Sequence, residues 1–186
     1  PFCADEGGFR CDQCQPGHKC MRGDAMEEIC PAGTYSSPER TSCLECAAGQ
    51  FSSSGSQYCQ DCPAGQYSAN SGASTCAACP SGQYSSSSGS SSCQVCPAGQ
   101  YSASAGSTSC QDCPAGKFSA RGGSSSCDDC PAGQYSADAG SSGCQICQPG
   151  QYSASTRSTS CQDCPAGQFS RVGAATRCND CPAGQY

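Results

Sequence analysis

Cysteine is the residue type with the greatest capacity for chemistry in this sequence, since 23 of the 186 residues are Cys. Most of them recur in C-x2-C pairs at a regular interval. Thiols at such spacing can form disulfides, bind zinc as a set of four thiolates, or exchange electrons through a redox-active pair. The choice among these chemistries depends on the sequence between the pairs.

That intervening sequence is an internal repeat of 17 residues, with an early period of 16. Its consensus is C-P-A-G-Q-[YF]-S-x6/7-C-x2-C. We divide the chain into an irregular cysteine-rich cap, or the end of a preceding module, over 1–29, nine tandem repeats over 30–180, and the start of a tenth, truncated repeat over 181–186. The nine repeats begin at Cys30, Cys46, Cys62, Cys79, Cys96, Cys113, Cys130, Cys147 and Cys164.

The register of the repeat predicts one disulfide per unit, which closes a loop of about 14 residues and so restricts the unfolded chain. Pairing inside C-x2-C would form strained bridges and leave the long loops unclosed. We therefore expect the two residues between those cysteines to be only a hinge between modules. The nine predicted disulfides are Cys30–Cys43, Cys46–Cys59, Cys62–Cys76, Cys79–Cys93, Cys96–Cys110, Cys113–Cys127, Cys130–Cys144, Cys147–Cys161 and Cys164–Cys178.

The cysteines outside these loops are less constrained. In the cap, continuing the register gives Cys3–Cys11 and Cys14–Cys20, whereas an interlaced pairing joins Cys3 to Cys14 and Cys11 to Cys20. The sequence leaves both pairings open. Cys181 lies in the incomplete repeat, so we expect it to be unpaired or bonded to another subunit, and we expect the functional object to be longer than this segment.

Zinc and calcium are the metals to weigh. The C-x2-C pairs have a spacing close to that of four-thiolate zinc sites, but Pro-Ala-Gly follows nearly every second cysteine and His18 is the only histidine. An aspartate recurs between the cysteines, and because calcium needs several converging oxygens we expect a turn residue there instead. We predict no metal and no cofactor. The recurring aspartates are Asp61, Asp112, Asp129, Asp163 and Asp180.

Residue types also predict the fold class. Pro after Cys, with Gly two residues later, predicts a turn, the aromatic-Ser step suits a short extended stretch, and a second Gly marks a mid-loop turn. We predict a small disulfide-rich fold, an elongated rod of tandem hairpin-like repeats with short β, little regular secondary structure and no significant helix, in which each unit touches only its neighbours. The in-phase aromatic residues are expected to form a spine against the prolines and disulfides: Tyr35, Phe51, Tyr67, Tyr84, Tyr101, Phe118, Tyr135, Tyr152, Phe169 and Tyr186.

The unit C-P-A-G-x-[YF]-S…C-x2-C resembles the ephrin-receptor-like cysteine-rich repeat, which is similar in style to EGF-like and tumour-necrosis-factor-receptor-type modules. The resemblance covers Cys30 to Tyr186, with departures at Ala47, Gln148-Pro149 and Arg157, which replaces the mid-loop Gly. This resemblance implies an extracellular location, loop-closing disulfides and a role as a spacer or in assembly. Arrays this uniform and this rich in Ser and Ala resemble those of long surface fibrils and flagellar hairs (mastigonemes) of algae and protists.

Charge and residue inventory exclude several functional classes. With nine Lys and Arg and a net charge of −6, the chain offers no basic surface for nucleic acid. No apolar run is long enough to insert into a membrane. One His and scattered carboxylates supply no catalytic constellation, so we predict that the chain is not an enzyme. Dense disulfides persist in oxidising compartments, which places the chain outside the cell or at its surface.

Two surface features suggest further sites. Arg22-Gly23-Asp24 resembles the adhesive tripeptide displayed on disulfide loops of integrin ligands. The Ser-rich loops are predicted to be exposed and to accept O-linked sugar, whereas no ordinary N-linked sequon is present. The candidate serines are Ser85, Ser86, Ser87, Ser88, Ser90, Ser91, Ser92, Ser102, Ser104, Ser107 and Ser109.

These patterns predict a structural subunit or segment of an extracellular glycoprotein fibril, filament or mastigoneme-like surface appendage. Its partners would be copies of itself or further repeats of the same chain, together with covalent glycans. The alternative is the stalk or binding module of a cell-surface receptor or adhesion protein. Near-identical repeats favour the first, because a receptor array would vary its loops to make one distinctive surface. A third hypothesis, a redox or metal-storage protein, is supported only by the large number of cysteines.

Overall fold

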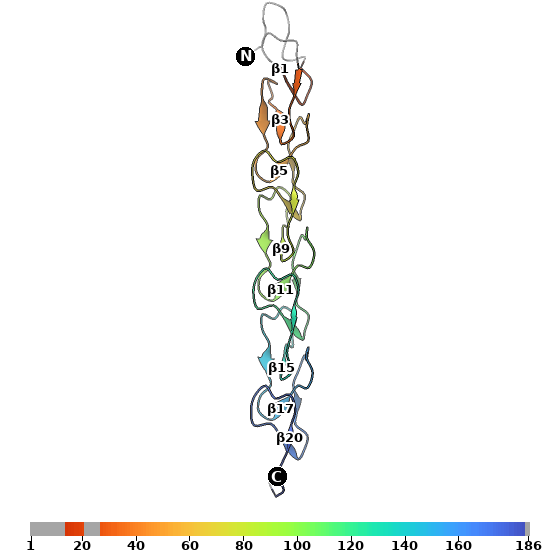
Figure 1. The fold of residues 1–186 in the computed structure, drawn as a ribbon, viewed down its shortest axis with the longest axis vertical. Coiled ribbons are helices and arrows are strands. Elements are labelled where there is room, and N and C mark those ends of the chain that lie inside the picture. Colours follow the sequence, from red (N-terminus) through yellow and green to blue (C-terminus); the bar gives the residue numbers. More distant parts are fainter. Residues whose placement is uncertain (1–13, 21–26, 185–186) are drawn as a thin grey trace, which may run out of the picture. The chain divides into compact units, whose positions relative to one another are not determined.

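The computed structural model describes residues 14–20 and 27–184, and within these ranges the only regular elements are short strands. They form two-stranded sheets, one after another along the chain (Figure 1). The fold class predicted from the sequence, disulfide-rich with short β and no significant helix, is confirmed for this part of the chain. The strands pair as β1(His18–Cys20) with β2(Glu27–Ile29), β3(Thr34–Ser36) with β4(Cys43–Glu45), β5(Gln50–Phe51) with β6(Gln60–Asp61), β7(Gln66–Tyr67) with β8(Ala77–Ala78), β9(Gln83–Tyr84) with β10(Gln94–Val95), β11(Gln100–Tyr101) with β12(Gln111–Asp112), β13(Lys117–Phe118) with β14(Asp128–Asp129), β15(Gln134–Tyr135) with β16(Gln145–Ile146), β17(Gln151–Tyr152) with β18(Gln162–Asp163), and β19(Gln168–Phe169) with β20(Asn179–Asp180).

Each repeat is a hairpin whose second strand contains the two residues inside C-x2-C. In the fifth repeat, β11 and β12 are antiparallel, with Gln100 opposite Asp112 and Tyr101 opposite Gln111. The prediction that these two residues are only a hinge is therefore wrong. Because they pair with the Gln-aromatic strand of their own repeat, they extend the hairpin up to the next module.

The turn that opens each repeat follows from Pro and Gly. In the third repeat, Gln66 N–H donates to the carbonyl of Pro63 at 3.0 Å, and Gly65 has φ +83°. A type II turn needs this positive φ at its third residue, which glycine adopts without steric cost. The turn tolerates loss of proline, since Gln50 N–H donates to Ala47 at 3.0 Å and Gln151 N–H to Gln148 at 2.9 Å.

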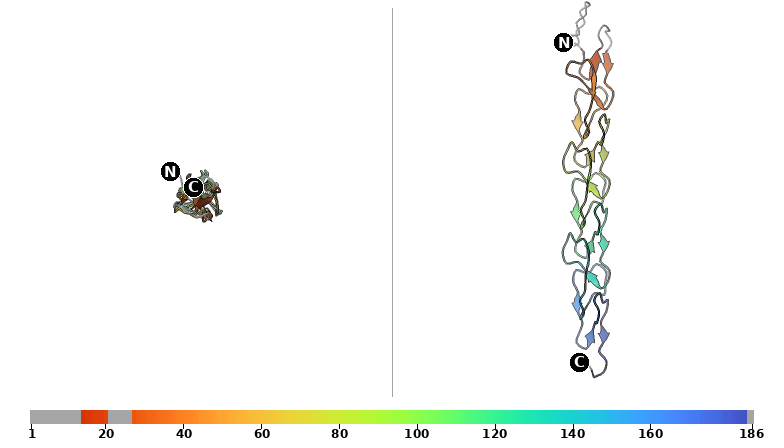
Figure 2. Two further views of the ribbon diagram at one scale, coloured as in Figure 1. Left: turned by 90° about the horizontal axis from the view of Figure 1, so that it is seen from above. Right: turned by 90° about the vertical axis from the view of Figure 1, so that its left-hand side faces the viewer.

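A ladder of backbone hydrogen bonds joins successive repeats. The mid-loop N–H of Gly123 donates to the carbonyl of Cys96 in the preceding repeat at 2.8 Å. The turn glycine, Gly99, donates to the carbonyl of Ser119 in the following repeat at 2.8 Å, and its own carbonyl accepts from Cys113 N–H at 2.9 Å. The same bonds recur along the chain, and the strand pairs are seen from a second side in the right-hand view of Figure 2.

Cysteine and serine form the buried interior. The opening cysteine is 0 % exposed in every repeat from Cys30 to Cys147. The serine after the aromatic residue, which we call the core serine, is also buried, at 1 % exposure for Ser52 and Ser119. The aromatic residues from Tyr35 to Phe169 are only half-buried. The rings therefore do not form the core, because the backbone ladder brings the small side chains to the interior, and the expected spine of rings against the prolines and disulfides stays a prediction.

Contacts also extend beyond the nearest neighbour. A Cβ atom added to Gly99 would lie 2.1 Å from the carbonyl oxygen of Gly140, which belongs to the repeat after next. The turn glycines Gly33, Gly49, Gly65 and others of the same phase approach a mid-loop backbone in this way. The expectation that each unit touches only its neighbours is therefore wrong. A mid-loop residue such as Gly140 bonds to the opening cysteine of the preceding repeat and also approaches the opening turn of the repeat before that.

The contacts divide the chain into two compact units. The first consists of Pro1–Cys79, Tyr84–Gln94 and Gly106–Thr108, and the second of Pro80–Gln83, Val95–Ala105 and Ser109–Tyr186.

Candidate functional site

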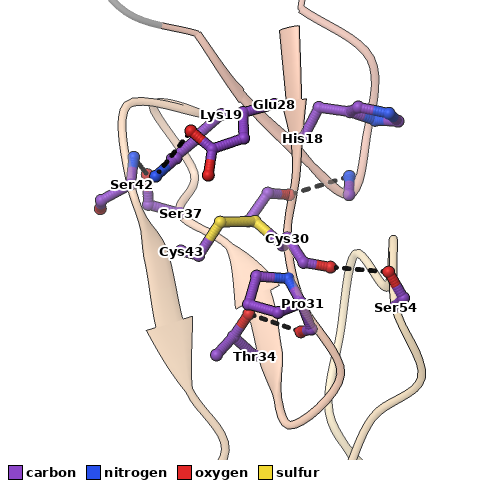
Figure 3. Close-up of a disulfide and its surroundings, with 12 residues drawn as sticks. His18, Lys19, Glu28, Cys30, Pro31, Thr34, Ser37, Ser42, Cys43 and Ser54 are labelled. Carbon is purple, nitrogen blue, oxygen red and sulfur yellow. Dashed lines mark hydrogen bonds and ion pairs between the residues drawn. A yellow bond between two sulfur atoms is a disulfide. The ribbon is translucent and has the colours of Figure 1, made fainter.

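The repeated disulfide is the first candidate feature. The structure joins the same nine pairs that the repeat register predicts, from Cys30–Cys43 to Cys164–Cys178, with Cα–Cα distances of 5.5 to 5.7 Å. In each, the closing cysteine is half-buried. Figure 3 shows the Cys30–Cys43 bridge, with Ser54 Oγ donating to the carbonyl of Cys30 at 3.3 Å. These bonds use both sulfurs of every C-x2-C pair between residues 43 and 164, so none is left as a zinc-binding thiolate.

The cap cysteines are described in part. Cys14 is bonded to Cys20, as in the pairing that continues the repeat register. Cys3 and Cys11 lie outside the described residues. Cys181 is a free, half-buried thiol. The sulfurs of Cys14 and Cys20 lie within 4.8 Å of a Glu27 carboxylate oxygen, but sulfurs bonded to each other supply no thiolate for a metal.

The recurring aspartates lie in strands, so the prediction of a turn residue is wrong. Each ends the second strand of its hairpin, opposite the glutamine or lysine that begins the first. Gln100 Nε2 donates to Asp112 Oδ1 at 2.9 Å, and the same bond joins Gln50 to Asp61, Gln151 to Asp163 and Gln168 to Asp180 at 2.9 to 3.0 Å. A carboxylate held by a neutral amide across the hairpin aligns the two strands.

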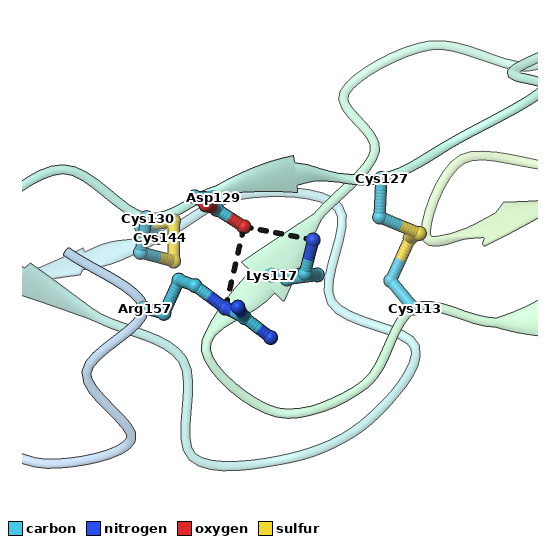
Figure 4. Close-up of polar contacts among 7 residues, drawn as sticks. All are labelled: Cys113, Lys117, Cys127, Asp129, Cys130, Cys144 and Arg157. Carbon is cyan, nitrogen blue, oxygen red and sulfur yellow. Dashed lines mark ion pairs between the residues drawn. A yellow bond between two sulfur atoms is a disulfide. The ribbon is translucent and has the colours of Figure 1, made fainter.

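One repeat replaces this amide with a charge cluster (Figure 4). Asp129 Oδ1 lies 2.8 Å from Lys117 Nζ across the hairpin and 3.5 Å from Arg157 Nε. Arg157 occupies the mid-loop position with φ +62°, so the left-handed conformation is kept without glycine. Ala174, with φ +60°, is a second mid-loop residue of this kind that the sequence reasoning missed. The sequence did contain a signal for it, because Ala174 lies ten residues after Cys164, just as Gly123 lies ten residues after Cys113.

The candidate glycosylation serines divide into two groups. Ser85 and Ser102 are core serines, each 3 % exposed, so their prediction as exposed sites is wrong. The physical reason is that the backbone ladder runs through them: Ser85 N–H, for example, donates to Ser107 of the next repeat at 3.2 Å. Ser90 and Ser107 are half-buried. The remaining candidates are exposed: Ser86, Ser87, Ser88, Ser91, Ser92, Ser104 and Ser109.

Hydrogen bonding explains why Ser90 is half-buried. The core hydroxyl of Ser85 lies 2.7 Å from Ser90 Oγ, and Ser90 Oγ donates to the carbonyl of Ser87 at 3.0 Å. This arrangement recurs in the repeats that contain Ser119, Ser136 and Ser153. By contrast, in the repeats from Cys46 onward the two residues before the closing cysteine are exposed. This adds hydroxyls that the sequence reasoning missed although they share the repeat phase of Ser91 and Ser92: Ser74, Thr75, Thr108, Ser125, Ser126, Ser142, Thr159, Ser160 and Thr176.

The tripeptide Arg22-Gly23-Asp24 lies outside the described residues, so its interpretation as an adhesive site stays a prediction. Among the residues that the structure describes, no helix has the length and apolar character needed to cross a membrane.

The family model described as tyrosine-protein kinase ephrin type A/B receptor-like matches residues 49–92, 82–130, 99–142, 116–164 and 133–181. The chain belongs to this ephrin-receptor-like family. The five overlapping matches span more than two thirds of the chain and confirm the resemblance seen in the repeat consensus. No curated protein matches the chain. Tandem ephrin-receptor-like modules, each closed by a disulfide, indicate an extracellular structural or binding segment.

Proposed function

We propose that this chain is a structural segment of an extracellular fibril, filament or surface appendage of the mastigoneme type, and that it has no catalytic role. The observation that carries the proposal is the constancy of the ladder between repeats. The mid-loop N–H donates to the preceding opening cysteine at 2.7 to 2.9 Å for every mid-loop residue from Gly55 to Ala174. This hydrogen bond is kept even where Arg157 or Ala174 replaces glycine. Such constancy favours an array that is built by repeating one structural unit.

The surface chemistry supports the same proposal. The interior is made of cysteine, serine and backbone, so the loops are free to carry polar groups outward. Exposed hydroxyls such as Ser91 and Ser109 recur on these loops. We propose that some of them carry O-linked sugar and that the partners of the chain are further repeats or copies of itself. A polar, glycosylated exterior would keep a thin assembly soluble.

The second candidate is the stalk or binding module of a cell-surface receptor or adhesion protein. The family description, which names an ephrin type A/B receptor, favours it. So does the charge cluster at Lys117, Asp129 and Arg157, which makes one place along the array different from the others.

Adding repeats tests the structural proposal. Variants with residues 113–129 present twice or three times insert one or two complete repeats. If the repeats build a linear structure, small-angle X-ray scattering of the oxidised full-length chain will show the maximum dimension growing by one fixed increment per insertion. A particle that grows only as the cube root of its mass contradicts the proposal. Immunogold labelling of native material then separates the candidates, since labelling along filaments supports the fibril and labelling only at cell membranes supports the stalk.

A further inference from the structure

The covalent path through the array differs from the path of the backbone. A disulfide connects the opening and closing cysteine of a repeat directly, as from Cys96 to Cys110, whose Cα atoms are 5.7 Å apart. The backbone between the same two residues takes 14 steps. Two further residues, Gln111 and Asp112, lead to the next opening cysteine, Cys113. The shortest covalent route therefore alternates a disulfide with a C-x2-C segment.

The lengths of the two routes differ greatly. A fully extended chain spans about 3.5 Å per residue, so three steps from Cys110 to Cys113 add about 10 Å. With the Cα–Cα distance of 5.7 Å across the disulfide, one repeat can stretch to about 16 Å when oxidised. The 17 residues of the same repeat stretch to about 60 Å once the bridge is reduced. The disulfides thus lower the limiting length of the array nearly fourfold.

The C-x2-C segment of this short route is already extended. Its two residues form β12, which pairs with β11 of the same repeat, and the Gln100 to Asp112 side-chain bond of 2.9 Å adds to the pairing. A strand rises about 3.3 Å per residue, close to the limit for an extended chain. Tension applied to the two ends of the array therefore cannot lengthen the C-x2-C segments appreciably. The array can extend only if its strands and disulfides change their orientation relative to one another.

The loops lie outside this covalent route. The opening turn, the mid-loop residue and the exposed hydroxyls before the closing cysteine all lie between the two bridged cysteines. Tension that runs through the disulfide bypasses them. Loop sequence and loop modification can therefore change without altering the limiting length of the chain.

We infer that the array acts as a strain-limiting tether, in which the nine repeat disulfides and the C-x2-C strands carry tension while the loops stay outside the load path. The function concerns one chain and does not depend on the fibril assignment, since a receptor stalk would need the same property. The absence of native filaments would contradict the proposed fibril and leave this inference standing.

Single-molecule force spectroscopy on the full chain, held by tags at its two ends, tests the inference. Under oxidising conditions we expect the segment from Cys30 to Cys181 to stretch to no more than about 16 Å per repeat. Adding dithiothreitol under tension reduces each bridge to two thiols and should release nine steps of about 40 Å, one for each loop of 13 or 14 residues. Steps of about 5 Å, the length expected for bridges inside C-x2-C, would overturn the inference.

A double substitution assigns the load to a particular bridge. The variant C96S/C110S should lengthen the fully stretched oxidised chain by about 43 Å and lose one reduction step, whether or not that repeat still folds, because the stretched length depends only on covalent connectivity. The control S91A/S92A changes two exposed loop residues and should leave every length unchanged. An unchanged oxidised length in C96S/C110S would show that this bridge is not in the load path and would refute the inference.

Discussion

Substitution of Gly99 by alanine tests the contact between next-but-one repeats. Gly99 has φ +85°, and a Cβ atom there would lie 2.1 Å from the carbonyl oxygen and 2.8 Å from the carbonyl carbon of Gly140. The backbone has little freedom to move away, since Gly99 donates to Ser119 and accepts from Cys113 at 2.8 and 2.9 Å. We expect about 1–2 kcal/mol from the left-handed conformation and a further 1–3 kcal/mol or so from overpacking.

Gly150 is the matched control. It has φ +87°, it donates to Ser170 at 2.9 Å and accepts from Cys164 at 2.8 Å, and in the segment 1–186, on which both variants are to be made, no described atom lies within 4 Å of its added Cβ. Gly150→Ala should therefore cost only the conformational part, about 1–2 kcal/mol. Gly99 and Gly150 have nearly the same φ and make the same two backbone hydrogen bonds. The difference between the stability losses of the two variants therefore measures the effect of the close contact with the repeat after next.

Amide hydrogen exchange of the oxidised chain measures this difference. The N–H groups to follow are those of Cys113 and Cys164, which donate to the carbonyls of the two substituted residues. Because about 1.4 kcal/mol is a tenfold change in an equilibrium constant, Gly99→Ala should lose about 5- to 150-fold more protection at Cys113 than Gly150→Ala loses at Cys164. Equal losses in the two variants would refute the reasoning, since the contact would then contribute nothing.

Three further predictions concern side chains. Asp129→Ala removes a partly exposed carboxylate shared by half-buried Lys117 and exposed Arg157, so we expect denaturant unfolding to show a loss below about 1 kcal/mol that disappears in about 1 M salt; a loss that persists in salt would contradict a screened surface interaction. Ser136→Ala removes a core hydroxyl that is 2 % exposed and should cost about 1–2 kcal/mol, whereas exposed Ser142→Ala should stay within about 0.5 kcal/mol, and a reversal of that order in the same unfolding experiment would be incompatible with the buried hydroxyl pair. Peptide mapping of native material should find any O-linked sugar at exposed positions such as Ser91 and none at Ser85, so a glycan on Ser85 would contradict its burial.

Several features of the fold could be predicted because they depend on residues close together in the sequence. A proline followed two residues later by glycine specifies the opening turn through backbone preferences alone. The loop from Cys96 to Cys110 follows from the repeat register, since only one pairing closes every long loop in the same way. The family resemblance depended on the same local pattern.

The errors arose where a residue's role depends on contacts with residues distant in the sequence, either in its own hairpin or in another repeat. Asp112 has the composition of a turn residue, but it lies in a strand because Gln100 of the same hairpin pairs with it. Ser85 and Ser91 have the same residue type and lie in the same loop, yet the first is buried and the second exposed. No property of serine distinguishes them; the ladder to the following repeat does.

The sequence by itself determined the disulfide register, the opening turns, the short strands and the family, because each is encoded within a single 17-residue unit. Only the tertiary structure decided which small residues form the interior, that C-x2-C is a strand, and that Gly99 meets Gly140. The physical reason is that strand pairing joins residues such as Gln100 and Asp112 that are distant in the sequence, while burial and close approach are properties of stacked repeats. Their backbone hydrogen bonds cross from one unit to the next, and the residue pattern of one unit does not specify which of its atoms the next unit covers.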